Sequence, residues 1–272
     1  MNKCTRWILL GGCFRFWQGY TISYFSLNYF NQFDRANTFG LVNGLSVLIG
    51  GFGSNMVAGW ISDKYEPTSN RTKPLVCIVM SLLAIPVCIG CYATNFSFWF
   101  SMFCLSFEYA LGEGWAPPAI SMILTVIDPQ FKGVGIALFL FSTTISGTIA
   151  LLVIGKIEDS VGADNTGALS WVLTLSTVIP CFLAAGCFYI AMGHYVDFKK
   201  KQEEAKEAAL TKVTNFDQDI RTFSTTNGVD LAEFRRRNGS ISLGAMRSLG
   251  GTRNGRQVSS SMHVKGSLRG LQ

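Results

Sequence analysis

The chain has 272 residues, of which 49% are hydrophobic and only 15% are charged. A soluble domain of this length carries about a quarter of its residues as charges, so we do not expect a water-soluble globule. The net charge of +6 lies entirely in residues 196–272, which hold 14 basic and 8 acidic residues, whereas residues 1–195 hold nine of each. This excludes a basic nucleic-acid-binding domain, whose positive charge would lie on a folded face.

Residues 1–195 contain six apolar segments, each long enough to cross a bilayer as an α-helix, which takes about 20 residues. Lipid offers backbone amides no hydrogen-bond partner, and continuous apolar runs without alternation exclude the strands of a membrane barrel. We therefore expect an all-α membrane domain with six transmembrane helices, followed at 196–272 by a basic and mostly disordered cytoplasmic tail. The expected spans are residues 7–30, 37–61, 75–94, 97–127, 133–156 and 169–193.

The loop charges predict how this domain lies in the membrane. Basic residues of short loops stay in the cytosol, and six spans place both ends of the chain on the same side. The basic residues gathered on that side are Lys3, Arg6, Lys64, Arg71, Lys73, Lys132, Lys199, Lys200 and Lys201. We therefore expect both termini to be cytoplasmic in a multi-pass membrane protein.

Ionisable residues inside the expected spans are candidates for a substrate or ion pathway, because charge in the bilayer interior is costly unless it is paired or hydrated. Arg15 lies in the first span with Gln18 one turn further along the same face, and Glu108 and Glu113 lie in the fourth. Five helical residues turn the chain by about 140°, so we expect at most one glutamate to face a central cavity. Arg15 would bind an anionic group of a substrate, and one glutamate would carry a coupling proton or pair with Arg15. The alternatives are an Arg–Glu pair that staples the two spans, or an Arg15 side chain that reaches toward the interface.

Small residues in the second and fifth spans favour close packing of helices. The glycines expected to pack in this way are Gly40, Gly44, Gly51 and Gly147. In the fourth span, Pro117 and Pro118 remove amide donors and predict a bend or break. Pro86 and Pro180 predict milder breaks in the third and sixth spans.

The end of the second span carries the most specific local pattern. Gly59 is followed four residues later by Asp63 and Lys64, and then by Arg71 and Lys73. This pattern resembles the loop motif of the major facilitator superfamily, which lies between the second and third helices of a six-helix half. The resemblance implies that the glycine permits close helix approach and that the aspartate makes cytoplasmic charge contacts that hold one conformation. The residues between the aspartate and the later basic positions depart from the family pattern.

A second stretch supports the same resemblance. Residues 112–120, which read Gly-Glu-Gly-Trp-Ala-Pro-Pro-Ala-Ile, and residues 128–133, which read Asp-Pro-Gln-Phe-Lys-Gly, resemble the fourth helix, loop and fifth helix of a superfamily half. The basic tail after the last span makes the chain similar to the carboxyl-terminal half, with most likeness to the spinster-like group.

The resemblance implies a secondary transporter, or half of one, that moves a small organic solute by alternating access, with proton coupling as an expectation. Its partners would be membrane lipids, the solute and a second six-helix half, encoded upstream or supplied by dimerisation. The alternative is a non-transporting membrane scaffold or accessory subunit that keeps the fold. We expect no enzymatic activity, no cofactor and no metal site, because zinc-binding and catalytic motifs are missing from the sequence.

Overall fold

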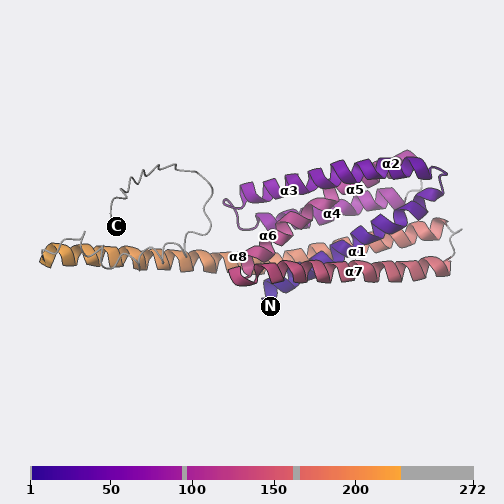
Figure 1. The fold of residues 1–272 in the computed structure, drawn as a ribbon. Coiled ribbons are helices and arrows are strands. Elements are labelled where there is room, and N and C mark those ends of the chain that lie inside the picture. The colour runs from indigo at the N-terminus through magenta and orange to yellow at the C-terminus, as the bar shows by residue number, and fades with distance from the viewer. Residues whose placement is uncertain (1, 94–96, 162–165, 228–272) are drawn as a thin grey trace, which may run out of the picture. The chain divides into compact units, whose positions relative to one another are not determined.

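The computed structural model describes residues 2–93, 97–161 and 166–227, and within these ranges all regular structure is helical (Figure 1). The all-α class expected from the sequence is therefore confirmed for this part of the chain. The elements are α1 (Lys3–Asn31), α2 (Ala36–Ser46), the π-helix η1 (Val47–Gly51), α3 (Phe52–Tyr65), α4 (Thr72–Tyr92), α5 (Phe98–Gly112), the 3₁₀ turn η2 (Glu113–Trp115), α6 (Ala116–Val126), the 3₁₀ turn η3 (Pro129–Phe131), α7 (Lys132–Val161) and α8 (Thr166–Asn227).

Four helical stretches of the described chain are long and apolar enough to cross a membrane. Two expected spans fall outside this set for physical reasons. Helix α1 has 29 residues but carries Arg15, Gln18 and several hydroxyl groups, and α5 and α6 have only 15 and 11 residues on either side of η2. The count of six spans therefore stays a prediction. The four stretches are Ala36–Tyr65, Thr72–Tyr92, Pro129–Ser160 and Thr166–Phe216.

The helix breaks follow the proline positions only in part. The break predicted at Pro117 and Pro118 is confirmed, since η2 separates α5 from α6 and both prolines lie in the first turn of α6. The milder breaks expected at Pro86 and Pro180 are absent, because α4 and α8 each continue through their proline. Membrane helices tolerate a single proline when neighbouring groups satisfy the freed carbonyl.

In the first compact unit, Met1–Lys201, successive long helical stretches run in alternating directions, so that α1 and α7 run the same way (Figure 1). Helix α1 lies along α7, and α4 lies along α5 with α2 and η1 beside them (Figure 1). Two large buried clusters and a small third one, formed by Ala84, Ile85 and Cys181, make up the core. One surrounds Tyr29, Tyr92 and Phe98, and the other surrounds Ile8, Trp115 and Phe188. The middle of α1 and the end of α5 lie between these clusters along the chain.

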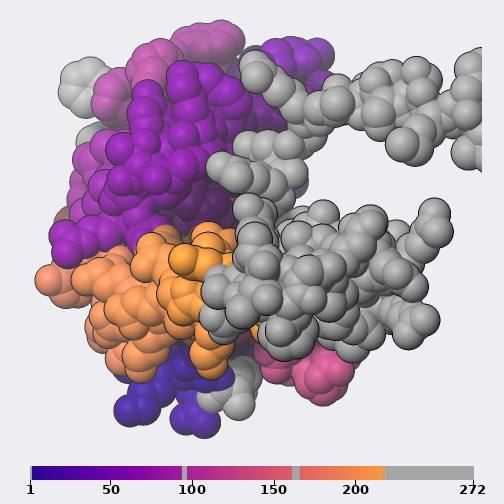
Figure 2. Space-filling model, turned by 90° about the vertical axis from the view of Figure 1, so that its left-hand side faces the viewer, coloured from indigo at the N-terminus to yellow at the C-terminus, as the bar shows by residue number. Residues whose placement is uncertain are grey.

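The surface of α2, η1 and α3 is strongly apolar and uncovered. Figure 2, which views the helices from one end, shows the end of α3 in purple. Four large apolar side chains on this surface are each at least 60% exposed, namely Leu48, Phe52, Met56 and Trp60. Little of the most apolar part of Ala36–Tyr65 is buried within the described residues. Such a surface requires lipid or another protein segment as its neighbour.

A second unit begins at Gln202. Its described part, residues 202–227, is helical and belongs to α8. The disorder predicted for the remainder falls on residues 228–272, which lie outside the described residues.

Candidate functional site

Two polar side chains of α1 are buried in the bundle. Arg15 is 2% exposed and Gln18 is 1% exposed, and their separation of three residues places them on one face of the helix. Glu108 of α5 is also only 1% exposed. The structure thus brings together three of the four residues that the sequence singled out for a pathway.

Hydrogen bonds of this buried group link four helices, α1, α4, α5 and α8. Arg15 donates from Nη1 to the Cys181 Sγ at 3.2 Å and from Nη2 to the Gly112 carbonyl oxygen. Gln18 donates from Nε2 to Glu108 Oε1 at 2.8 Å. The same Nε2 also lies 3.6 Å from the Sγ of Cys88 on α4. We call Arg15, Gln18 and Glu108 the central polar cluster.

Two polar atoms of the central polar cluster have no hydrogen-bond partner among the described residues. They are Arg15 Nε and Glu108 Oε2, and both are fully buried. An unpaired polar atom costs about 1–3 kcal/mol when it is buried, and a charged group costs more in the membrane interior. The cluster therefore has unused capacity for one donor and one acceptor, which a proton, a water molecule or a polar ligand group could use.

The local geometry at the end of α5 explains how Arg15 and Glu108 approach each other. A methyl group added at Gly112 would lie 2.5 Å from Glu108 Oε1 and 3.4 Å from Arg15 Nη2. A larger residue there would displace both side chains. The 3₁₀ turn that follows leaves the Gly112 carbonyl available to Arg15, and the guanidinium carbon lies 5.8 Å from the Trp115 ring centroid. The helix break therefore supplies an acceptor for a buried cation.

Glu113 lies in η2 and is only half-buried. The structure buries Glu108 on α5 and leaves Glu113 half-buried in the turn that follows. The roles of both glutamates in a pathway stay predictions.

A second charged group lies at the turn between α3 and α4. Glu66 accepts from Lys73 Nζ at 2.6 Å and from Lys199 Nζ at 2.9 Å, and Tyr195 donates to the same carboxylate at 3.2 Å. Lys73 is 4% exposed and donates to the Ser121 hydroxyl at 2.6 Å. This Glu66 network joins the turn to α4, α6 and α8.

The charge balance at Glu66 favours its ionised form. Partial burial raises the pKa of the carboxyl group, but hydrogen bonds and attraction from Lys73 and Lys199 outweigh burial, so the pKa lies below its ordinary value. Glu66 follows the last residue of α3 and lies outside the membrane-spanning stretches.

The residues of the loop motif occupy different environments in the structure. Asp63 is 73% exposed and lies 3.7 Å from Lys73, so the less exposed carboxylate of this turn is Glu66, at 22%. Lys64 lies over the Trp60 ring at 4.5 Å, and Arg71 precedes α4 with an exposed side chain. A methyl group at Gly59 would contact Pro117 at 3.6 Å. The conformational roles carried over from the superfamily stay predictions.

The glycines expected to pack helices fall into two groups. A methyl group at Gly147 would lie 2.6 Å from the Tyr20 ring, so α1 and α7 approach closely there. Methyl groups at Gly40, Gly44 and Gly51 would meet nothing within 4 Å in the described residues. Any close approach at these three positions needs a neighbour outside the described chain, and their packing role stays a prediction.

Several residues of these two sites were missed by the sequence analysis, among them Glu66, Lys199 and Cys181. Glu66 lies within the stretch that departs from the superfamily pattern, and Lys199 lies in a run of three lysines. An acidic residue in a loop of basic residues was the available signal for Glu66. Cys181 had no signal, because a cysteine in an apolar run is normally a small hydrophobe.

Comparisons with known proteins add one distant likeness. No protein-family model matches the chain. A search of curated proteins finds an "MFS-type efflux pump" of Mycolicibacterium smegmatis that is 23% identical over 141 residues, which is 52% of this chain and 33% of that protein. Within the described part of the chain, no group of three or more His, Cys, Asp or Glu side chains could hold a metal ion. The long apolar helices and this likeness together indicate an integral membrane protein.

Proposed function

We propose that this chain forms a six-helix half of a secondary transporter that moves a small organic solute by alternating access, coupled to protons. The apolar helices and the likeness to an efflux pump support the general class. In this proposal α1 and the α5–η2–α6 unit also cross the bilayer. The polar residues of α1 and the broken backbone after α5 are tolerated there because both are buried within protein.

The observation that carries the proposal is the central polar cluster. Glu108 and Arg15 are buried with opposite charges, and each keeps one polar atom without a partner. Ionised Glu108 attracts Arg15 and accepts from Gln18, which holds α1 against α5. A proton on Oε2 would remove that attraction and let the two helices separate. Proton binding would thereby be linked to helix movement.

The second half of the transporter is proposed to cover apolar surface that this chain leaves open. Transporters of this architecture place their solute site between two repeats. The surface of α2, η1 and α3 carries Leu48, Phe52 and Trp60, which are each at least 60% exposed. The partner half is either part of the same polypeptide or a second copy of this chain.

One observation favours the alternative of a non-transporting scaffold or accessory subunit. Both terminal nitrogens of Arg15 already bond to groups of its own chain, the Cys181 thiol and the Gly112 carbonyl. Such an arrangement holds α1, α5 and α8 together without a solute. Measurement of proton movement separates the two proposals.

The test is solute-driven proton flux in proteoliposomes that contain the full chain and a trapped pH-sensitive dye. A panel of sugars, amino acids, organic anions and organic cations is added outside. We expect at least one solute to move protons with the wild type, and Glu108→Gln to abolish proton movement while downhill solute exchange persists. Glu158→Gln, which removes a charge that accepts from Asn28 at an exposed site, is the matched control and should behave as wild type.

Two results would decide against transport through this cluster. Equal proton flux in the wild type and in Glu108→Gln would show that Glu108 does not carry the transported proton. No solute-dependent flux from folded wild-type protein, alone or co-expressed with its partner half, would favour the scaffold.

A further inference from the structure

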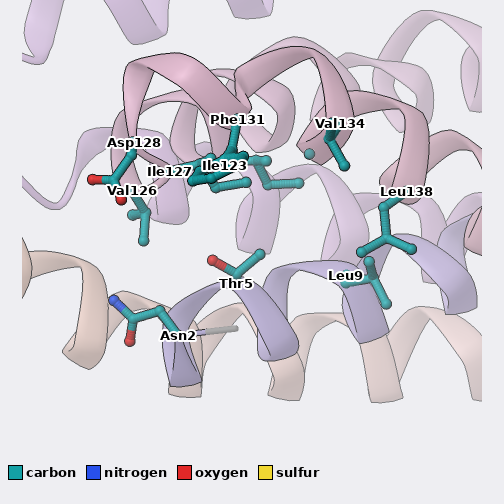
Figure 3. A pocket seen from close by; sticks show the side chains of 11 residues that line it. Asn2, Thr5, Leu9, Ile123, Val126, Ile127, Asp128, Phe131, Val134 and Leu138 are labelled. Atoms are coloured by element: carbon teal, nitrogen blue, oxygen red, sulfur yellow. The ribbon is translucent and has the colours of Figure 1, made fainter.

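The cavity between α1, the end of α6 and the beginning of α7 has a volume of about 470 Å³ (Figure 3). Most of its lining is apolar, and its one charged lining residue is Asp128, which is exposed and directly precedes η3. This lining does not select one class of ligand by charge. A selective pattern lies instead on the part of α8 that belongs to the second unit, residues 202–227.

Apolar residues of this part of α8 recur at alternating intervals of four and three residues. This period places them on one face of a helix and is typical of the seam between the two strands of a coiled coil. Most of the other residues between 202 and 227 are polar. We call the five residues at this spacing the α8 stripe: Ala209, Val213, Phe216, Ile220 and Phe223.

Two side chains of the α8 stripe are large, apolar and open to solvent. Phe216 is 66% exposed and Val213 is 37% exposed, and Leu210, which flanks the stripe, is 64% exposed. The opposite face is polar, and its Thr211 and Thr214 hydroxyls donate to carbonyl oxygens of their own helix at 2.9 and 3.0 Å. An apolar stripe beside a satisfied polar face requires a neighbour that also offers apolar surface.

Charge restricts what this neighbour is. Residues 202–227 hold three basic and five acidic residues, so the anionic lipids of a cytoplasmic leaflet repel the segment. A second copy of the same helix is complementary. In a parallel pair of strands, the residues that flank the seam form ion pairs between one strand and a position five residues later on the other. Lys212 and Asp217 have this spacing.

The Lys212 side chain is available for such a pair. It is exposed, and none of the ion pairs found among the described residues involves it. Because a symmetric dimer uses the same surface of both copies, the pair of Lys212 with Asp217 of the other copy would form twice. Apolar spacing and charge therefore both fit a second copy of this chain.

We propose that the α8 stripe joins two copies of this chain in a parallel two-stranded coiled coil. The inference rests on the proposed function only in placing the chain in a membrane, where both copies have the same orientation and their helices run the same way. A stripe of this length is marginal for two free helices in water. Confinement of both copies to one bilayer raises their effective concentration and offsets that weakness.

The first test is disulfide cross-linking of the full chain in vesicles of phosphatidylcholine and phosphatidylglycerol. Residues 188–272 contain no cysteine, so an introduced cysteine reports on this helix, and the wild type measures the background. With copper phenanthroline as the oxidant, Val213→Cys should form a covalent dimer at least tenfold faster than Thr211→Cys, the matched control on the polar face. Equal rates, or no dimer from Val213→Cys, would overturn the proposal.

The second test exchanges the two charges in the Val213→Cys background. Lys212→Glu sets acidic residues opposite each other and Asp217→Lys sets lysines opposite each other, so each should slow cross-linking about threefold or more. The variant with both changes restores the opposite charges and should recover the original rate. Glu204→Lys changes an exposed charge on the polar face and is the matched control. Failure of the double exchange to recover the rate contradicts the parallel register.

The third test asks whether the stripe lies on lipid instead. Tryptophan fluorescence of Phe216→Trp in vesicles with brominated acyl chains should match its fluorescence in vesicles without bromine, after subtraction of the wild-type signal. Strong quenching by the brominated lipid would place the stripe on the membrane and refute the dimer. None of the three tests measures transport, so a chain that cross-links as expected but moves no solute would reject the proposed function alone.

Discussion

Arg15 and Glu108 bring opposite charges into a part of the chain that is otherwise apolar. Their selection from the sequence was possible because membrane helices carry such residues only where they are paired or functional. Their partners were not predictable. The Gly112 carbonyl becomes available only through the backbone geometry of η2, and Cys181 meets Arg15 from a segment 166 residues away.

The close approach at Gly112 gives a prediction at the residue scale. Gly112→Ala places a methyl group 2.5 Å from Glu108 Oε1, and such overpacking should destabilise the protein by about 1–3 kcal/mol. Gly186→Ala is the matched control, because a methyl group there meets nothing within 4 Å. The control should be neutral or more stable by up to about 1 kcal/mol, since alanine favours helix. Thermal unfolding in detergent measures both, and equal midpoints would contradict the packing at Gly112.

Loss of Arg15 gives a second prediction. Arg15→Ala leaves the buried Glu108 carboxylate without its cation and should destabilise the protein by about 3–5 kcal/mol. Adding Glu108→Gln removes the uncompensated charge, so the double variant should be more stable than Arg15→Ala alone. Unfolding of the single and double variants at one pH tests this. Strict additivity of the two changes would show that the two side chains do not interact.

At the scale of the elements, proline positions predicted the break between α5 and α6 because two consecutive prolines remove two amide donors. Single prolines at 86 and 180 did not interrupt α4 or α8. The π-helix η1 was not predicted, because an i→i+5 turn depends on how neighbouring helices pack rather than on a residue pattern. The Glu66 network was also missed, since it needs α8 to meet the α3–α4 turn.

The Glu66 network gives a prediction for this turn. Glu66→Gln should destabilise the protein by about 1–3 kcal/mol at pH 7, because two lysines lose a charged acceptor. Asp63→Asn changes a carboxylate three residues earlier that is 73% exposed, and it should cost at most about 1 kcal/mol. Unfolding midpoints of the two variants compare the buried and the exposed carboxylate. A larger effect at Asp63 would place the main contact in the superfamily motif itself.

The lowered pKa of Glu66 fixes how this effect depends on pH. The contribution of Glu66 is complete above its ordinary pKa of 4.5 and is lost as the pH falls below that value and through the pKa in the folded protein. The difference between the wild type and Glu66→Gln should therefore shrink at acid pH. A difference that is constant from pH 7 down to pH 3 would show that the carboxylate charge is not involved.

At the scale of the whole molecule, composition was enough to predict an all-helical membrane domain, because long apolar runs can satisfy their backbones in lipid only as helices. The number of crossings did not follow as directly. Helix α1 carries polar groups and α5–α6 is interrupted, and each feature that reduces the apolar signal belongs to the central polar cluster or lies beside it. The polar residues and the helix interruption at the site thus lower the hydropathy by which the spans that contain it would be recognised.

The six-span arrangement predicts that both ends of the chain lie in the cytosol. Reporter domains fused before Lys3 and after Lys201 should both be cytoplasmic, and a tag in the α1–α2 turn at Asp34 should be extracytoplasmic. The physical basis is the retention of basic loops in the cytosol. Ends on opposite faces would mean an odd number of crossings and would refute the arrangement.

The burial of Glu108 on α5, where Leu105 and Tyr109 of one apolar cluster flank it and Trp115 of the other follows in η2, has an electrical consequence. Apolar layers hold most of the voltage drop across a membrane, and one elementary charge moved through the full drop is worth about 2.3 kcal/mol per 100 mV. A proton that reaches Glu108 from one side crosses one of the two layers and hence a fraction of that drop. Occupancy of this carboxylate by protons would consequently respond to membrane potential as well as to acidity.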